Sequence, residues 1–260
     1  MPENPFVTFR GVFAGYGGAD VLKDINFDVQ QGGVTTIVGP NGSGKSTLLK
    51  TVSGILEPRV GEIMFKGENL VGKSPKEILR LGVVQVPQNH SLFREMTVEQ
   101  NVALGAFLVK DKKVIASRLD TIREMFPIVA ERADDKAGSL SGGQQRLVEF
   151  ARCLMLEPDL VVLDEPSMGL DPKTLKSMFA TIKMMNSAGR TVLLVEQNAR
   201  RALKMSHHGV VLENGHVRLT GSGHEVLNHP EIGALYLGGS IEETSAATFV
   251  PAGPESETEQ

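Results

Sequence analysis

The sequence predicts an α/β fold built around a largely parallel sheet. Short runs of β-branched apolar residues alternate with helical patterns, as expected for strands joined by crossover helices. One run, Val34–Val38, is followed at once by a glycine-rich turn and then by a helical pattern. The composition, 41% hydrophobic and 22% charged, is that of an ordinary globular protein and excludes disordered, collagenous and disulfide-stapled classes.

The predicted strands fall into two groups. Phe6–Val12 and Val21–Val29 come early and indicate a flanking antiparallel part. The remaining runs are compact and rich in apolar and β-branched residues, which is typical of buried strands in a parallel sheet. They are Val34–Val38, Val83–Val86, Leu160–Leu163 and Thr191–Val195.

The longest helical stretch lies between the second and third of these buried strands. Residues 89–138 are mainly helical in character, with Pro127 as a break, and predict a helical subdomain inserted into the α/β core. A separate helical pattern covers Gln144–Leu156. Cys153 lies in this pattern, and we expect it to be a buried packing residue.

The negative charge of the chain belongs to its end. The net charge is −4, and residues 240–260 contain five glutamates and no lysine or arginine, so residues 1–239 carry +1. A near-neutral body lacks the net positive charge that often marks nucleic-acid binders. We expect one folded domain over residues 1–239, followed by an acidic, disordered tail over 240–260.

Other features of the composition bear on the compartment. A single cysteine cannot form an internal disulfide, which fits a reducing environment. The sequence has no run of 18 apolar residues and no visible secretory signal. These features predict a soluble, cytoplasmic protein.

The string Gly39-Pro-Asn-Gly-Ser-Gly-Lys-Ser-Thr47 is a P-loop pattern between a strand and a helix. Its glycines let the backbone curl so that successive N–H groups face a phosphate, and the helix N-terminus adds a favourable dipole. Lys45 can reach the β- and γ-phosphates, and the Ser46 hydroxyl can bind Mg²⁺. The string therefore predicts nucleotide binding.

Two adjacent carboxylates follow the predicted strand Leu160–Leu163. Neighbouring side chains on a strand point to opposite faces, so Asp164 and Glu165 can take different tasks. Asp164 suits a Mg²⁺ contact, direct or through water, and Glu165 suits a base that polarises an attacking water.

A second small-residue turn, Leu140-Ser-Gly-Gly-Gln-Gln-Arg146, opens the last helical pattern described above. Its exposed N–H groups form a second anion site, which one nucleotide in the same chain does not obviously use. Another copy of the chain can supply that nucleotide. A plain helix-capping turn remains the alternative from the residues alone.

Together these strings resemble the ATP-binding subunits of ABC transporters. The P-loop resembles that family's Walker A motif, Asp164–Glu165 its Walker B pair, and Leu140–Gln144 its LSGGQ signature. The match runs from Phe6 to Gly239 with every motif in order. It implies a P-loop NTPase (RecA-like) core with a flanking antiparallel β-subdomain and an inserted helical subdomain.

Shorter strings extend the resemblance. Tyr16, in Gly-Tyr-Gly-Gly, occupies the place where the family stacks an aromatic ring on adenine. Gln88, in Val-Pro-Gln, matches the glutamine that touches Mg²⁺ and water, and Gly169-Leu-Asp171 resembles the D-loop. The family implies a nucleotide-sandwich dimer, in which each ATP lies between the Walker A motif of one chain and the signature of the other.

One position departs from the general pattern and narrows the subfamily. Gln197 stands where a histidine is expected; it can donate a hydrogen bond to the γ-phosphate but cannot carry a positive charge, which leaves Glu165 as the candidate base. The string Val195–Ala199, the string Leu212–His216 and the ending Tyr236–Gly239 resemble LivF-type ATPases. These belong to importers of branched-chain amino acids and related amides.

The resemblance assigns roles residue by residue. Catalysis falls to Glu165, Lys45, Gln88 and Gln197, and Mg²⁺ binding to Ser46, Gln88 and Asp164. Nucleotide contacts fall to Tyr16, Gly39, Pro40, Asn41, Gly42, Ser43, Gly44, Lys45, Ser46, Thr47, Ser141, Gly142, Gly143 and Gln144.

The resemblance also implies the partners. They are a second ATPase subunit (a copy of this chain or a related ATPase), transmembrane permease subunits contacted by the helical insertion, and indirectly a solute-binding protein. No nucleic acid is expected, and the chain would lie in the cytoplasm, peripheral on the inner face of the cell membrane.

Two other classes of protein compete with this interpretation. A GTPase switch would need the string Asn-Lys-x-Asp, which does not occur. A non-transport ABC ATPase acting on nucleic acid or ribosomes remains the alternative function. Its DNA-repair types carry coiled coils or zinc modules, which the cysteine-free segment 89–138 does not hold, and its ribosome-acting types usually carry two cassettes in one chain.

Overall fold

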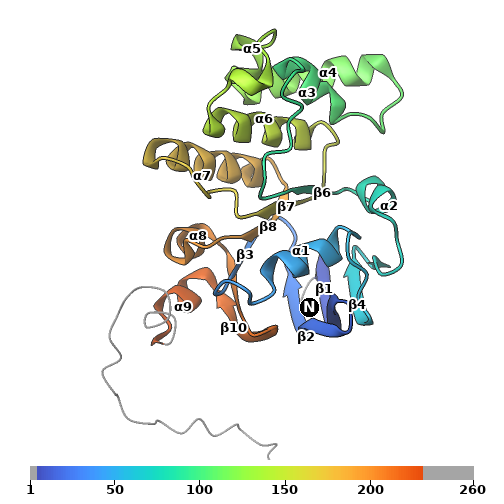
Figure 1. The fold of residues 1–260 in the computed structure, drawn as a ribbon, viewed down its shortest axis with the longest axis vertical. Helices are drawn as coiled ribbons and strands as arrows, with labels where there is room; N and C mark the ends of the chain where they lie inside the picture. The colour runs from blue at the N-terminus through green and yellow to red at the C-terminus, as the bar shows by residue number, and fades with distance from the viewer. Residues whose placement is uncertain (1–4, 231–260) are drawn as a thin grey trace, which may run out of the picture.

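Two sheets form the framework of the protein, whose computed structural model describes residues 5–230 (Figure 1). The smaller sheet is antiparallel and has the strand order β2-β1-β4-β5. Its strands are β1 (Val7–Tyr16), β2 (Ala19–Val29), β4 (Val60–Phe65) and β5 (Glu68–Asn69). The predicted antiparallel flank is therefore present, although β1 runs four residues beyond the predicted end at Val12.

The larger sheet has the order β10-β9-β3-β8-β7-β6. All its neighbours are parallel except the β9–β10 hairpin at one edge. Its strands are β3 (Val34–Val38), β6 (Val83–Val86), β7 (Leu160–Asp164), β8 (Thr191–Val195), β9 (His208–Glu213) and β10 (His216–Ser222). Every residue of β3, β7 and β8 is buried, which explains why these strands are mostly apolar or β-branched.

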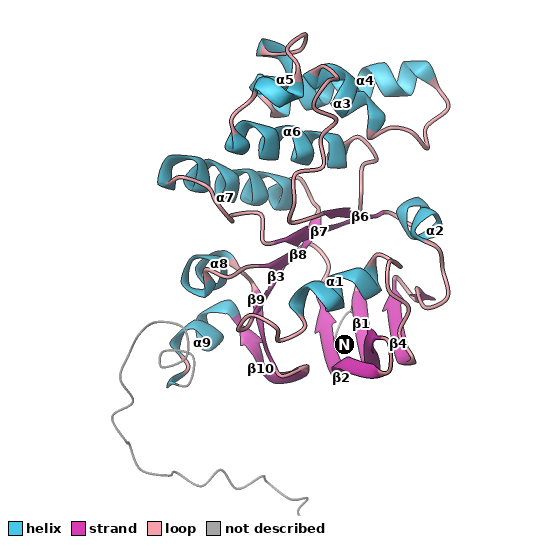
Figure 2. Ribbon diagram, in the orientation of Figure 1, coloured by secondary structure: helices cyan, strands magenta, loops and turns pink. Residues whose placement is uncertain are grey.

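A layer of helices lies on the side of this sheet that carries β6 and β7 (Figure 2). It contains α3 (Val98–Leu104), α4 (Lys112–Met125), α5 (Pro127–Glu131), the 3₁₀ turn Ala137–Ser139 and α6 (Gly142–Leu154). Pro127 ends α4 and takes the first position of α5, as the predicted break requires. Segment 89–97 precedes these helices without being helical, so the insertion is less helical at its start than predicted.

The remaining helices pack on the large sheet. They are α1 (Lys45–Val52), α2 (Pro75–Arg80), α7 (Pro172–Ser187), α8 (Ala199–Met205) and α9 (Gly223–Asn228). α6 begins two residues before the predicted Gln144, because Ser141 caps it. Cys153 is buried in the core between α6, α7 and the sheet, as expected.

Some sequence predictions lie outside the described residues. They are the Tyr236–Gly239 ending, the domain end at residue 239 and the acidic tail 240–260. Within residues 5–230, no helix combines the length and the apolar character needed to cross a membrane.

Candidate nucleotide-binding site

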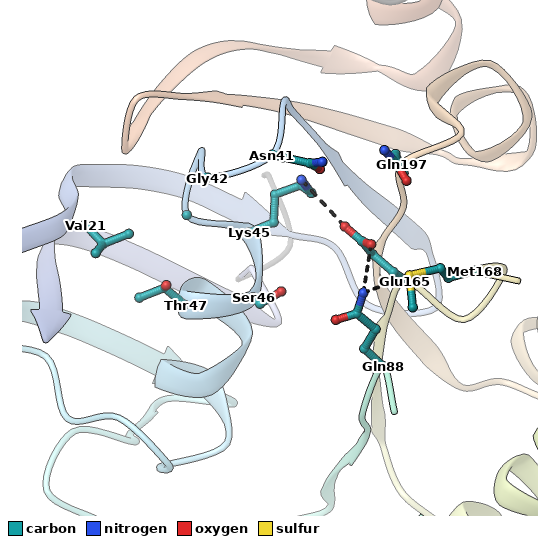
Figure 3. A pocket seen from close by; sticks show the side chains of 11 residues that line it. Val21, Asn41, Gly42, Lys45, Ser46, Thr47, Gln88, Glu165, Met168 and Gln197 are labelled. Carbon is teal, nitrogen blue, oxygen red and sulfur yellow. Dashed lines mark hydrogen bonds and ion pairs between the residues drawn. The ribbon is translucent and has the colours of Figure 1, made fainter. Parts of the chain in front are cut away.

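The carboxyl ends of the parallel strands gather the predicted site residues in one place. The P-loop follows β3, Gln88 follows β6, Glu165 follows β7 and Gln197 follows β8. These segments line a single cleft of about 380 Å³ (Figure 3). Ligands of open α/β sheets bind in this kind of crevice, outside the carboxyl ends of the strands.

The P-loop turns back on itself through glycines in the left-handed region. Gly42 has φ 80° and Gly44 has φ 106°, conformations that side chains rarely adopt, and α1 begins at the next residue. A Cβ on Gly39 would lie 2.2 Å from the carbonyl oxygen of Leu212 in the neighbouring strand β9. The loop therefore needs glycine both for its dihedral angles and for close backbone approach.

Lys45 is held inside this loop. Its Nζ donates to the carbonyl oxygens of Gly39 and Pro40, at 2.9 and 3.1 Å, and lies 3.6 Å from Oε1 of Glu165. The side chain is only 4% exposed, and that of Glu165 is 12% exposed. The lysine and the carboxylate therefore balance each other's charge.

Oxygen donors lie next to this pair. Ser46 Oγ donates to Oδ1 of Asp164 at 3.1 Å. Burial raises the pKa of the Asp164 carboxyl, against the lowering effect of the Ser46 hydrogen bond. The hydroxyl and the buried carboxylate together supply oxygen ligands of the kind that a divalent cation prefers.

Glu165 is aimed by a strained turn. Its φ is 42°, which is uncommon outside glycine, while its N–H donates to the carbonyl oxygen of Val195 at 2.9 Å. Oε2 accepts from Nε2 of Gln88 at 3.2 Å, and the same Nε2 lies 3.1 Å from the sulfur of Met168 (Figure 3). The structure thus joins two predicted catalytic residues that lie 77 positions apart.

The signature residues lie elsewhere. None of Ser141–Gln144 lines the cleft. Ser141 caps α6: its Oγ accepts from Gln144 N–H, while Oε1 of Gln144 accepts from Ser141 N–H. The signature turn is therefore a helix cap, which was one of the two interpretations that the sequence allowed. The N-terminus of α6 lies outside this chain's own cleft.

Tyr16 also stays outside the cleft. It is the last residue of β1 and pairs with Ala19 across the turn, with its side chain half exposed. Its hydroxyl accepts from Nζ of Lys50 at 3.1 Å, and that ammonium lies 5.4 Å from the ring centroid. The predicted adenine-stacking residue therefore does not belong to the lining of the cleft.

The sequence analysis missed one functional-looking carboxylate. Glu196 is fully buried, and its oxygens accept from the N–H of Ser167 at 3.1 Å and from its hydroxyl at 2.5 Å. Ser167 belongs to the turn that carries Glu165. An acid directly after a buried strand was the signal that singled out Asp164, and the same signal at Glu196 could have found this contact.

Comparisons with known proteins agree with this geometry. Residues 22–168 match the ABC transporter family, which is more than half of the chain. The chain belongs to that family. As a member, this ABC protein binds ATP and is an ATPase.

Individual relatives cover the ABC protein almost completely. The high-affinity branched-chain amino acid transport ATP-binding protein BraG of Pseudomonas aeruginosa is 40% identical, over 90% of this chain and all of its own. The probable branched-chain amino acid transport ATP-binding protein LivF of Archaeoglobus fulgidus is 35% identical, over 86% and 95%. The ADP form of an ATP-binding cassette of an ABC transporter superposes with TM-score 0.82 at 29% identity, over 91% of this chain and all of that one.

Proposed function

We propose that this ABC ATPase drives the import of branched-chain amino acids or related amides. The observation that carries the substrate class is the similarity to BraG along its whole length. The strings Val195–Ala199 and Leu212–His216 point to the same subfamily. The first string runs from the last residue of β8 to the first residue of α8, and the second spans the turn between β9 and β10.

The cleft suits hydrolysis of the terminal phosphate of ATP. The γ-phosphate would draw Lys45 away from Glu165, and P-loop amides would neutralise the remaining charge. Glu165, held by Gln88, then accepts a proton from a water that attacks the γ-phosphorus. The bond to the β–γ bridging oxygen breaks, and ADP leaves with that electron pair.

Ser46, Asp164 and Gln88 would hold Mg²⁺. Their hydroxyl, carboxylate and amide oxygens meet the cation's preference, and a bound cation would offset the cost of ionising the buried Asp164. When bound, Mg²⁺ neutralises charge on the β- and γ-phosphates. Gln197, an exposed residue of the cleft lining, would donate a hydrogen bond to the γ-phosphate.

A second ATPase subunit would complete the site. Ser141 and Gly143 lie at a helix N-terminus that this chain's own cleft does not use. We propose that they close over a nucleotide held by the partner's Walker A motif, and that the partner's signature closes over this one. The partner is either a copy of this chain or a related ATPase.

The helical layer offers a surface for the permease. An apolar groove of about 360 Å³ lies between α3, α6 and the edge strand β6, and Phe93 and Phe107 are more than half exposed at its rim. Permease subunits seated here would contact the segment that carries Gln88, and would place the ATPase on the inner face of the membrane. A solute-binding protein would then act through the permease.

A Glu165→Gln variant tests the ATPase proposal. It should bind ATP but release phosphate about a hundredfold or more slowly, because its amide accepts no proton. A Lys45→Ala variant is the matched control and should lose nucleotide affinity. Full hydrolysis by Glu165→Gln would contradict the assignment of the base.

The same variant reports on the partner. If the chain pairs with itself, Mg-ATP should shift the solution mass of Glu165→Gln from 28.0 kDa to about twice that value. If ATP binds and the mass stays monomeric, the second subunit is a different ATPase. The substrate class is tested in intact cells: loss of the chain should abolish uptake of labelled leucine, and unchanged uptake would contradict it.

A further inference from the structure

Helix α6 turns one charged face toward the segment that carries Gln88. Arg146, Glu149 and Arg152 are spaced by three residues along the helix, so their side chains share that face. All three contact residues 87–91, which connect β6 to the helical layer. The same helix begins at the signature turn.

Arg146 binds the end of this segment that lies nearest to the cleft. Nη1 donates to the carbonyl oxygen of Pro87 at 2.9 Å, and Nη2 donates to that of Gln88 at 2.6 Å. The residue is only 2% exposed, and its Nη1 lies 2.8 Å from Oε2 of Glu149. Burial lowers the pKa of this guanidinium, which the Glu149 carboxylate opposes.

The other two residues hold the far end of the segment. Oε1 of Glu149 accepts from the N–H of Ser91 at 2.5 Å, and Nη1 of Arg152 donates to its carbonyl oxygen at 2.9 Å. The backbone of residues 87–91 is therefore tied to α6 at both ends. Gln88 itself is left to extend its side chain to Glu165.

We propose that Arg146 is a positioning residue for ATP hydrolysis. By fixing the carbonyls of Pro87 and Gln88, it sets the distance at which the Gln88 amide meets Glu165. Because α6 starts at the signature, a shift of that turn by a partner's nucleotide reaches the attacking-water site through Arg146. This inference rests on the proposed roles of Gln88 and Glu165.

The double contact of Arg146 requires a planar guanidinium group. A guanidinium presents two parallel N–H donors that fit two successive carbonyl oxygens, whereas a lysine ammonium is a point charge on a different stem. Arg146→Lys keeps the charge facing Glu149 but loses the double contact. We expect its kcat to fall about tenfold or more, with nucleotide affinity unchanged.

The matched control lies in the same helical layer. Arg118 of α4 donates to the carbonyl oxygen of Met155 at 3.0 Å and pairs with Glu157, without touching residues 87–91. Because its ion pair with Glu157 is partly exposed, Arg118→Lys should lower the thermal midpoint less than Arg146→Lys does, and it should leave kcat near the wild-type value. An equal loss of kcat in both variants would mean that Arg146 affects kcat only through the stability of the fold, and would overturn the proposal.

A double-mutant cycle with Gln88 decides whether Arg146 acts through that residue. In a Gln88→Ala background, measured by single-turnover phosphate release, Arg146→Lys should cause no further loss. A loss of the same size in both backgrounds would overturn the proposal, as would wild-type kcat in Arg146→Lys or in Gln88→Ala. Failure of the proposed function shows separately, as full hydrolysis by Glu165→Gln.

Discussion

Lys45 and Glu165 form a pair whose members have separate tasks in the proposed reaction. With Nζ 3.6 Å from Oε1, each limits the other: the ammonium faces a carboxylate instead of a phosphate, and the carboxylate faces an ammonium instead of a water. Arrival of a γ-phosphate would separate them. The resting arrangement therefore keeps the proposed base occupied until nucleotide is in place.

Gln197 provides a test at the level of one side chain. Its amide lines the cleft and can donate one hydrogen bond to the γ-phosphate, but it takes up no proton. Gln197→Ala should lower kcat about tenfold, as expected when a hydrogen bond to a charged group is lost. Steady-state phosphate release measures this, with Arg200→Ala at a nearby exposed position of α8 as the control. An unchanged rate would remove Gln197 from the mechanism.

Glu196 gives a pH-dependent prediction. Burial raises the pKa of its carboxyl above the ordinary value of 4.5, against the Ser167 hydrogen bonds, so the folded state binds the proton more tightly than the unfolded chain. This contribution to stability is complete below pH 4.5 and is lost as the pH rises through the raised pKa. Glu196→Gln, which cannot ionise, should show a smaller fall in stability with pH.

Denaturant titrations between pH 4 and 8 measure the difference. Glu131→Gln, at an exposed position of α5, is the control and should follow the wild-type profile. If the free energies of unfolding of Glu196→Gln and wild type fall in parallel over this pH range, the prediction for Glu196 is wrong.

At the level of elements, the signature glycines have different tasks. A Cβ on Gly143 would lie 2.0 Å from Cγ2 of Thr174, so α6 and α7 approach closely there, whereas a Cβ on Gly142 would meet nothing nearer than 3.6 Å. Gly143→Ala should therefore destabilise the fold by about 1–3 kcal/mol, and Gly142→Ala by much less. Chemical denaturation measures both, and equal losses would show that the helices can separate freely.

Several elements follow from local chemistry that the sequence analysis did not use. Ser74 and Glu77 form a capping box with Pro75 at the first turn, which begins α2. Asn214 and Gly215, both with positive φ, make the turn of the β9–β10 hairpin. Both patterns are legible in the printed sequence.

At the scale of the whole molecule, the cleft and the signature lie in different parts of one chain. If two copies pair, a chain with Lys45→Ala keeps its signature, and a chain with Ser141→Arg keeps its P-loop. Mixing these two variants should restore hydrolysis at one complete site per mixed pair, although each alone is inactive. Phosphate release from the mixture measures this. No recovery, when both variants bind wild-type chain, would exclude a shared site between identical copies.

The fold class, the parallel strands and the P-loop follow from the sequence by itself, because glycine placement and short runs of apolar and β-branched residues act through local sterics and burial. The tertiary structure alone decided which residues meet. Gln88 contacts Glu165, Glu196 contacts Ser167 and Arg146 contacts the Gln88 backbone because strands β6, β7 and β8 are neighbours and α6 packs against β6. Such contacts join distant positions, and their geometry depends on strand order, which no local pattern encodes.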